Sequence, residues 1–137
     1  MIKLFIGSKG SGKTKTLIEL TNAAAEASNG SVVCIEKGSK LNFEISHQCR
    51  LIDTDEYAVT DAQALYGFIA GILASNHDVT DLFVDSALKI CQNDAASFDT
   101  FLTNLDNLLK TVEVNCVITS SLAVEEASET VKKFIAE

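Results

Sequence analysis

Short runs of apolar, often β-branched residues alternate along this chain with longer stretches in which apolar residues recur every three or four positions. Uninterrupted apolar runs are typical of strands buried on both faces, and the longer spacing is typical of amphipathic helices. We therefore expect strands at 2–6, 32–35, 51–52, 81–85 and 114–119. We expect helices at about 13–27, 61–75, 95–110 and 125–135, and a helical turn at 87–91. Asn42–Ile45 alternates between polar and apolar residues, which predicts one further short strand.

The order of these elements indicates the class of fold. Strands that alternate with helices are typical of a parallel sheet with helices on both faces. We therefore predict a three-layer α/β/α fold with a mostly parallel central sheet. The chain has 137 residues, 47% of them hydrophobic, and it contains no proline. No linker or repeat divides it, so we expect a single domain over residues 1–137.

The segment between the first strand and the first helix is rich in glycine and reads GSKGSGKT. It fits G-x-x-x-x-G-K-[ST], the P-loop pattern, in which backbone N–H groups at a helix N-terminus surround a chain of phosphates. We expect Lys13 to reach the β- and γ-phosphates and the Thr14 hydroxyl to bind Mg²⁺. The alternative is an ordinary flexible connector. The candidate nucleotide-binding residues are Gly7, Ser8, Lys9, Gly10, Ser11, Gly12, Lys13 and Thr14.

A second candidate site residue follows the apolar run Leu82–Val84. Asp85 stands where that strand ends, and parallel sheets bind their ligands at the carboxyl ends of the strands. Carboxylate oxygens suit Mg²⁺, so we take Asp85 together with Thr14 as the metal ligands. The alternative is that Asp85 only caps the helical turn that comes next.

These features resemble the P-loop NTPases of the RecA-like ATPase class. The resemblance rests on Gly7–Thr14, on Leu82–Ser86 and on Val117–Ser121. It implies a minimal RecA-like fold, ATP and Mg²⁺ as the bound cofactors, and a strand that ends in a polar sensor residue. That sensor would be Ser120 or Thr119, and its strand would lie between the P-loop strand and the strand that ends in the acid.

The chain is also similar, along nearly its whole length, to small bacterial ATP-binding proteins often labelled twitching-motility PilT-like. The similarity includes the segment Tyr66–Asn76. The motif residues support the ATP-binding part of that label. They do not support the motility part. The true motility ATPases are larger, and they carry an extra N-terminal domain and conserved acidic and histidine motifs that are not found in this sequence.

The sequence leaves the base for ATP hydrolysis open. Many members of the class place a glutamate directly after the magnesium-binding acid, and this chain has Ser86 there. RecA-like members instead carry a glutamate at the end of the second strand, where Glu36 is the nearest candidate. The alternative is that Glu36 is a loop acid paired with Lys37 or Lys40.

Two further acids and one arginine also bear on catalysis. Asp53 and Asp55 follow the next strand, and Arg50 is the only arginine of the chain. An arginine finger commonly stabilises the transition state, so here that charge would come from Arg50, a lysine or another protein. We therefore expect a weak or partner-dependent ATPase, and the alternative is an ATP- or ADP-binding module without hydrolysis. The catalytic candidates are Lys13, Glu36 and Ser120.

Charge and missing motifs argue against several other classes of function. The net charge of −8 argues against a nucleic-acid partner. The N-K-x-D element of GTPases and the basic lid of small-molecule kinases are not found. A first strand beginning at Ile2 leaves no room for a signal peptide, and no apolar run is long enough to span a membrane, so we expect a cytoplasmic protein. A homo-oligomer or a protein partner stays open.

The cysteines and histidines do not form a metal-binding pattern. The four cysteines include no C-x-x-C pair. Cys34 and Cys116 fall in expected strands and should be buried thiols. His47 and His77 stand in loop-like sequence and should lie at the surface.

Overall fold

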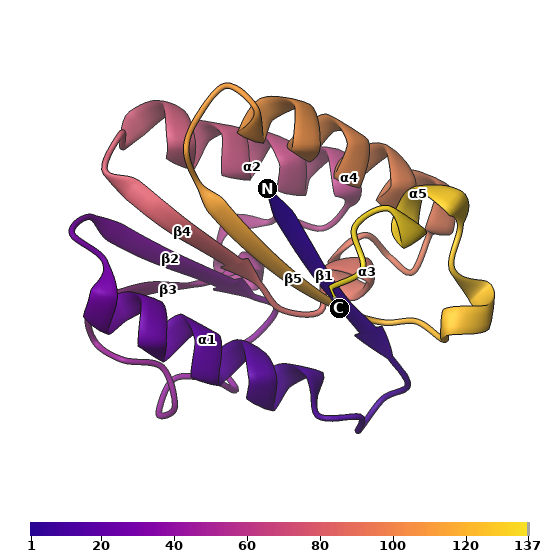
Figure 1. Ribbon diagram of the computed structural model, residues 1–137, viewed down its shortest axis with the longest axis horizontal. Helices are drawn as coiled ribbons and strands as arrows, with labels where there is room; N and C mark the ends of the chain where they lie inside the picture. The colour runs from indigo at the N-terminus through magenta and orange to yellow at the C-terminus, as the bar shows by residue number, and fades with distance from the viewer. Residues whose placement is uncertain (137) are drawn as a thin grey trace.

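A five-stranded sheet forms the centre of the molecule in the computed structural model, which describes residues 1–136 (Figure 1). The strand order is β1-β5-β4-β2-β3, and every neighbouring pair is parallel. The strands are β1 (Ile2–Gly7), β2 (Ser31–Glu36), β3 (Cys49–Asp53), β4 (Val79–Val84) and β5 (Asn115–Ser121). Strand β5 lies between β1 and β4, which is the place that the resemblance implied for the sensor strand.

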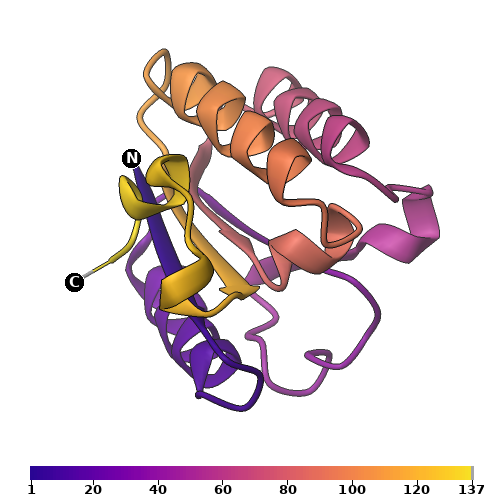
Figure 2. The same cartoon turned by 90° about the vertical axis from the view of Figure 1, so that its right-hand side faces the viewer.

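Helices cover both faces of this sheet, which gives the expected three-layer α/β/α fold (Figures 1 and 2). One helix, α1, packs on one face, and α2 and α4 lie side by side on the other. The helices are α1 (Lys13–Ala27), α2 (Ala62–Ser75), α3 (Ala87–Ile90), α4 (Ala95–Leu109) and α5 (Glu129–Lys132). Two short 3₁₀ turns, η1 (Thr54–Tyr57) and η2 (Val124–Glu126), complete the chain. No helix among residues 1–136 has both the length and the apolar character needed to span a membrane.

The sheet is buried on both sides because successive side chains of a strand point to opposite faces. In β2, Val33 and Ile35 belong to the larger core under α2 and α4, whereas Val32 and Cys34 belong to the smaller core under α1. This explains why the strand reads as one continuous apolar run. Cys34 and Cys116 are buried, as expected, and His47 and His77 are exposed.

The expected strand at Asn42–Ile45 is wrong. Residues 40–44 form turns, and the Ile45 N–H bonds to the carbonyl of Leu41 within the segment itself. Asn22 of α1 holds this segment from outside, because its side chain donates to the carbonyl of Glu44 at 2.9 Å and accepts from the N–H of Ser46 at 2.8 Å. The alternation is misleading because its two apolar residues do not share a face: Ile45 is buried, whereas Phe43 is fully exposed.

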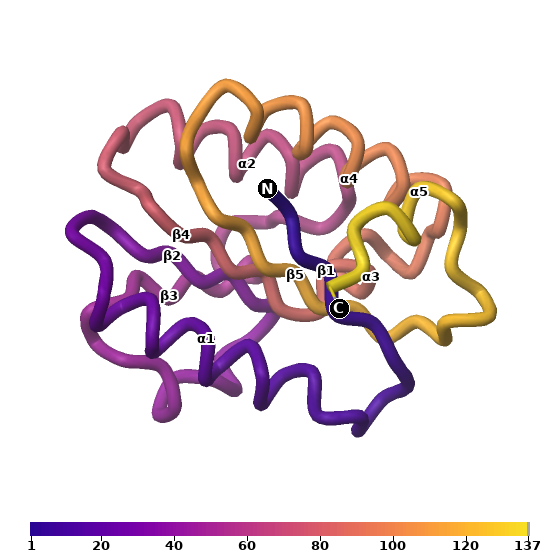
Figure 3. Tube along the Cα trace, in the orientation of Figure 1, coloured from indigo at the N-terminus to yellow at the C-terminus, as the bar shows by residue number. Residues whose placement is uncertain are grey.

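The expected closing helix at 125–135 is also wrong. Only η2 and the single-turn helix α5 form there, because the Ser128 hydroxyl starts a new helix by capping the N–H of Val131. The chain then becomes extended and adds to the free edge of β1 (Figures 1 and 3). Leu4 donates to the carbonyl of Phe134 and accepts from the N–H of Ala136, both at 2.8 Å. Pairing with an open strand edge therefore replaces the last turns of helix.

Candidate functional site

The glycine-rich segment connects the end of β1 to the start of α1, as the motif requires. Gly10 and Gly12 have φ angles of +85° and +90°, a left-handed conformation that side chains with a Cβ rarely adopt. Gly12 occupies the N-cap position of α1, and no side chain caps the first turn of that helix. The first N–H groups of α1 and its positive dipole end are therefore left for a ligand, which is the usual basis of anion binding at a helix N-terminus.

Lys13 lies across this loop. Its Nζ donates to the carbonyl of Ser8 at 2.8 Å and to the hydroxyl of Ser11 at 3.2 Å. The loop itself is closed by a bond from the Ser11 N–H to the Ser8 carbonyl at 3.1 Å. The ammonium group therefore already lies against the backbone that would surround a phosphate.

Asp85 is the centre of a buried hydrogen-bond network at the carboxyl end of the sheet. Asp85 is 2% exposed, and its Oδ1 accepts from the hydroxyl of Thr119 at 2.8 Å and from that of Thr14 at 3.2 Å. Its Oδ2 accepts from the hydroxyl of Ser86 at 3.3 Å. Asp85 does not cap α3, because the N-cap residue of α3 is Ser86 and no side chain bonds there.

The surroundings of Asp85 fit a magnesium ion bound with a nucleotide. None of the ion pairs within residues 1–136 involves Asp85, and a buried carboxylate is normally paired with a cation or a metal. Groups of three or more metal-binding His, Cys, Asp or Glu side chains are not found in this part of the chain. Mg²⁺ does not need such a group, because it is commonly held by one or two carboxylates and by the phosphates of its substrate.

A cavity of about 550 Å³ opens beside the P-loop. Its walls include five lysines but no acidic side chain, although the chain carries a net charge of −8. The lysines are Lys9, Lys13, Lys15, Lys40 and Lys89. A second cavity, of about 460 Å³, lies at the amino ends of the strands. Asp78 and Glu113 line it, and no lysine does. Only the first therefore combines the P-loop with a positive lining suited to phosphates.

Three lysines of this cavity, Lys15, Lys40 and Lys89, are not among the site residues predicted from the sequence. Lys15 directly follows the motif, Lys40 is expected only as a possible ion-pair partner of Glu36, and the motifs give no role to Lys89. Lys40 follows β2 and Lys89 lies on α3, so each stands shortly after the carboxyl end of a strand. The rule that ligands bind at that edge could have identified both, because it applies to every strand of the sheet.

The two candidate sensor residues of β5 face in different directions. Thr119 lines the cavity, donates to Asp85 and accepts from the N–H of Ser86 at 2.9 Å. Ser120 is fully buried, and its hydroxyl accepts from the N–H of Leu88 at 3.2 Å. Thr119 is thus placed beside the expected ligand, while Ser120 holds the start of α3.

Glu36 is a buried residue and not a loop acid. The residue is 1% exposed at the end of β2, its Oε2 accepts from the N–H of Leu41 at 3.0 Å, and its Oε1 has no partner. Burial raises the pKa of Glu36, the bond from Leu41 opposes that shift, and the negative charge of Asp85 adds to it. It forms no ion pair with Lys37 or Lys40 within residues 1–136, and it does not line the cavity.

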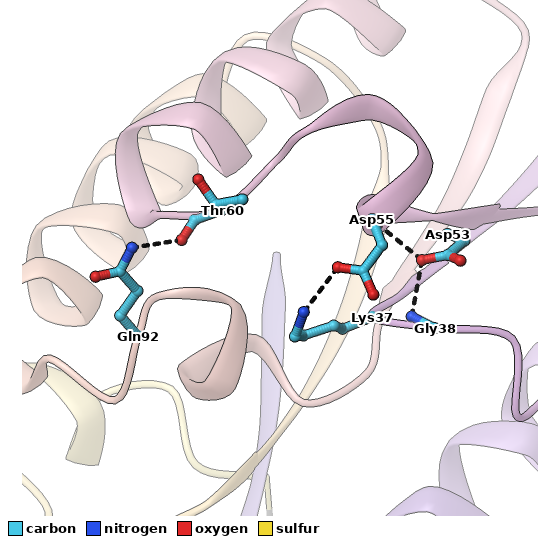
Figure 4. Close-up of polar contacts among 6 residues, drawn as sticks. All are labelled: Lys37, Gly38, Asp53, Asp55, Thr60 and Gln92. Atoms are coloured by element: carbon cyan, nitrogen blue, oxygen red, sulfur yellow. Dashed lines mark hydrogen bonds and ion pairs between the residues drawn. The ribbon is translucent and has the colours of Figure 1, made fainter.

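The remaining acidic candidates hold loops in place (Figure 4). Asp53 accepts from the N–H groups of Gly38 and Asp55, both at 2.8 Å, which ties the loop after β2 to the end of β3. Asp55 pairs with Lys37 at 2.7 Å. Arg50 is exposed on β3, donates to the carbonyl of Leu51 and does not line the cavity.

Comparison with other proteins adds no assignment to this geometry. No model of a known protein family matches the chain. A search of functionally characterised proteins finds no match either. The function must therefore be inferred from the residues themselves: the uncapped start of α1, the buried Asp85 with its three hydroxyl donors, and the five lysines of the adjoining cavity.

Proposed function

We propose that this protein binds Mg-ATP at the P-loop, as a member of the RecA-like ATPase class, and hydrolyses the γ-phosphate slowly or with the help of a partner. The observation that carries the proposal is the contact of Thr14 with Asp85 beneath a cavity lined by lysines. The motif predicts a hydroxyl and an acid at this place for Mg²⁺. The strand order, with β5 between β1 and β4, also supports this class.

Each residue of the site then has a defined part in binding. The free N–H groups at the start of α1 and the ammonium group of Lys13 hold the β- and γ-phosphates. Thr14 and Asp85 would hold Mg²⁺, which would neutralise the charge of the phosphates. Thr119 fixes the orientation of the Asp85 carboxylate through its hydrogen bond.

Glu36 is our candidate for the base that activates water, because it is the nearest buried acid with an unpartnered oxygen. Its strand β2 is paired with β4, and the Asp85 N–H bonds to the carbonyl of Ile35, so Glu36 and Asp85 end adjacent strands. A base must come within hydrogen-bond reach of the attacking water. Glu36 does not line the cavity, so water must enter or the loop after β2 must move before it can act.

The alternative is a module that binds ATP or ADP without hydrolysis. Two observations favour it: the cavity wall contains Ser86 where many ATPases of the class carry a glutamate, and Glu36 lies outside that wall. Binding of nucleotide, not its cleavage, would then change the contacts of the protein.

Single-turnover assays separate the two functions. Purified protein in excess over ATP labelled at the γ-phosphate is filtered to measure bound nucleotide, and the filtrate is assayed for free phosphate. An ATPase that uses Glu36 binds ATP in both the wild type and Glu36→Gln but releases phosphate only in the wild type. Binding without release in the wild type favours the module, and Lys13→Ala is the control that should neither bind nor release. Phosphate release that survives Glu36→Gln and disappears in Lys13→Ala excludes Glu36 as the base.

A further inference from the structure

The cavity beside the P-loop receives positive charge from outside the motif. Lys9, Lys13 and Lys15 belong to the loop and the first turn of α1, but Lys40 and Lys89 come from other parts of the fold. Neither of these two lysines takes part in an ion pair within residues 1–136, and both are exposed. Two free cations in the wall of a small cavity attract an anion more strongly than the P-loop does alone.

The order of the strands indicates which end of a nucleotide these lysines would meet. Starting from β1, the order runs through β5 to β4 and then to β2. Lys40 follows β2, on the side of Asp85 that is away from the P-loop strand, whereas Lys89 lies on α3, which packs against β5 on the other side. The two lysines therefore lie on either side of Asp85. Mg²⁺ held by Thr14 and Asp85 would neutralise charge on the phosphates, so we expect the terminal phosphate close to Asp85 and within reach of these two lysines.

The short helix that carries Lys89 is fixed by the residues around it. Ser86, with a left-handed φ of 58°, turns the chain sharply after Asp85. The hydroxyls of Thr119 and Ser120 accept from the N–H groups of Ser86 and Leu88. At the other end, the Gln92 side chain donates to the carbonyl of Thr60 at 2.8 Å, as Figure 4 shows. The backbone of Lys89 is therefore held beside the cavity, while its side chain stays free to bind.

We propose that Lys40 and Lys89 bind the terminal phosphate and make this site prefer a nucleoside triphosphate to the diphosphate. This inference rests on the proposed function. Two lysines of the same chain would then supply the positive charge at the terminal phosphate, which related systems commonly take from an arginine finger. Arg50, the only arginine, lies outside the cavity.

The test is the ratio of ATP affinity to ADP affinity. Dissociation constants are measured in Mg²⁺ by competition with a fluorescent ADP analogue, for the wild type, Lys40→Ala, Lys89→Ala and the control Lys133→Ala. Lys133 is an exposed lysine that does not line the cavity, and its loss changes the net charge equally. Each cavity variant should lose about tenfold in ATP affinity and less than about twofold in ADP affinity. Lys89→Arg should keep the preference for ATP, because it keeps the charge.

Two results would overturn this inference, and a third would overturn the proposed function on which it rests. Equal losses of ATP and ADP affinity in Lys40→Ala and Lys89→Ala would show that these lysines do not bind the terminal phosphate. A loss of ATP affinity in Lys133→Ala as large as theirs would show only a long-range effect of charge. A wild type that binds neither nucleotide would refute the proposed function itself.

Discussion

Thr119→Val should destabilise this protein more than the loss of one hydroxyl normally does. Valine matches threonine in shape, so no cavity forms, but the hydroxyl of Thr119 both donates to Asp85 at 2.8 Å and accepts from the N–H of Ser86 at 2.9 Å. A hydrogen bond to a charged group contributes about 1.5–3 kcal/mol, and leaving a buried donor without a partner costs about 1–3 kcal/mol. We expect a loss of about 2.5 kcal/mol in the free energy of unfolding.

The matched control is Thr21→Val. Thr21 is also fully buried, but its hydroxyl donates to the carbonyl of Leu17 within α1, which is uncharged and belongs to the helix ladder. Its loss should cost about 1 kcal/mol. Both variants are compared with the wild type by urea unfolding at neutral pH without nucleotide. A cost for Thr119→Val no greater than that for Thr21→Val would refute the network around Asp85.

A double-mutant cycle measures the contact itself. In an Asp85→Asn background the carboxylate charge is gone, so Thr119→Val should cost about 1 kcal/mol less than it does in the wild type. Equal costs in the two backgrounds would show that Thr119 acts on stability without Asp85.

Two more predictions concern backbone and thiols. Gly12→Ala should cost about 1 kcal/mol or more because Gly12 has a φ of +90°, whereas Gly67→Ala in α2 should stabilise by about 0.5–1 kcal/mol; thermal melts that rank them otherwise contradict the loop geometry. Burial raises the pKa of Cys49 to about 11 and those of Cys91 and Cys116 to about 12. Unfolded thiols ionise near pH ~8.5 while the folded ones keep their protons, so stability is retained below that pH and falls by about 1.4 kcal/mol per pH unit per thiol above it. Urea unfolding under reducing conditions at pH 7, 9 and 10 measures this, and stability that stays flat to pH 10 would refute it.

The elements that depend on local pattern could be predicted from the sequence. Apolar spacing was enough for α2 and α4, because each helix buries one face along its length. Continuous apolar runs were enough for β2 and for the last half of β4, because those residues are buried. The P-loop and Asp85 could be placed from a motif and from the rule that parallel sheets bind ligands at one edge.

Features that depend on distant contacts could not be predicted. The segment Asn42–Ile45 is shaped by Asn22 of α1, and residues 134–136 are shaped by the open edge of β1. Adjacent residues on a strand face opposite sides, so a shift of one position decides whether Thr119 or Ser120 lines the cavity. The burial of Glu36 and the approach of Lys40 to the P-loop likewise follow from the loop between β2 and β3, for which the sequence carries no motif.

The melting temperature in Mg-ATP tests the central claim most directly. A ligand that binds only the folded state stabilises it by about 2.7 kcal/mol at a concentration of 100 times its Kd. For a domain of this size that corresponds to a rise of about 9 °C. We predict such a rise for the wild type and none for Lys13→Ala, whose P-loop lacks the ammonium group. An unchanged melting temperature in the wild type, or an equal rise in both proteins, would contradict nucleotide binding at Gly7–Thr14.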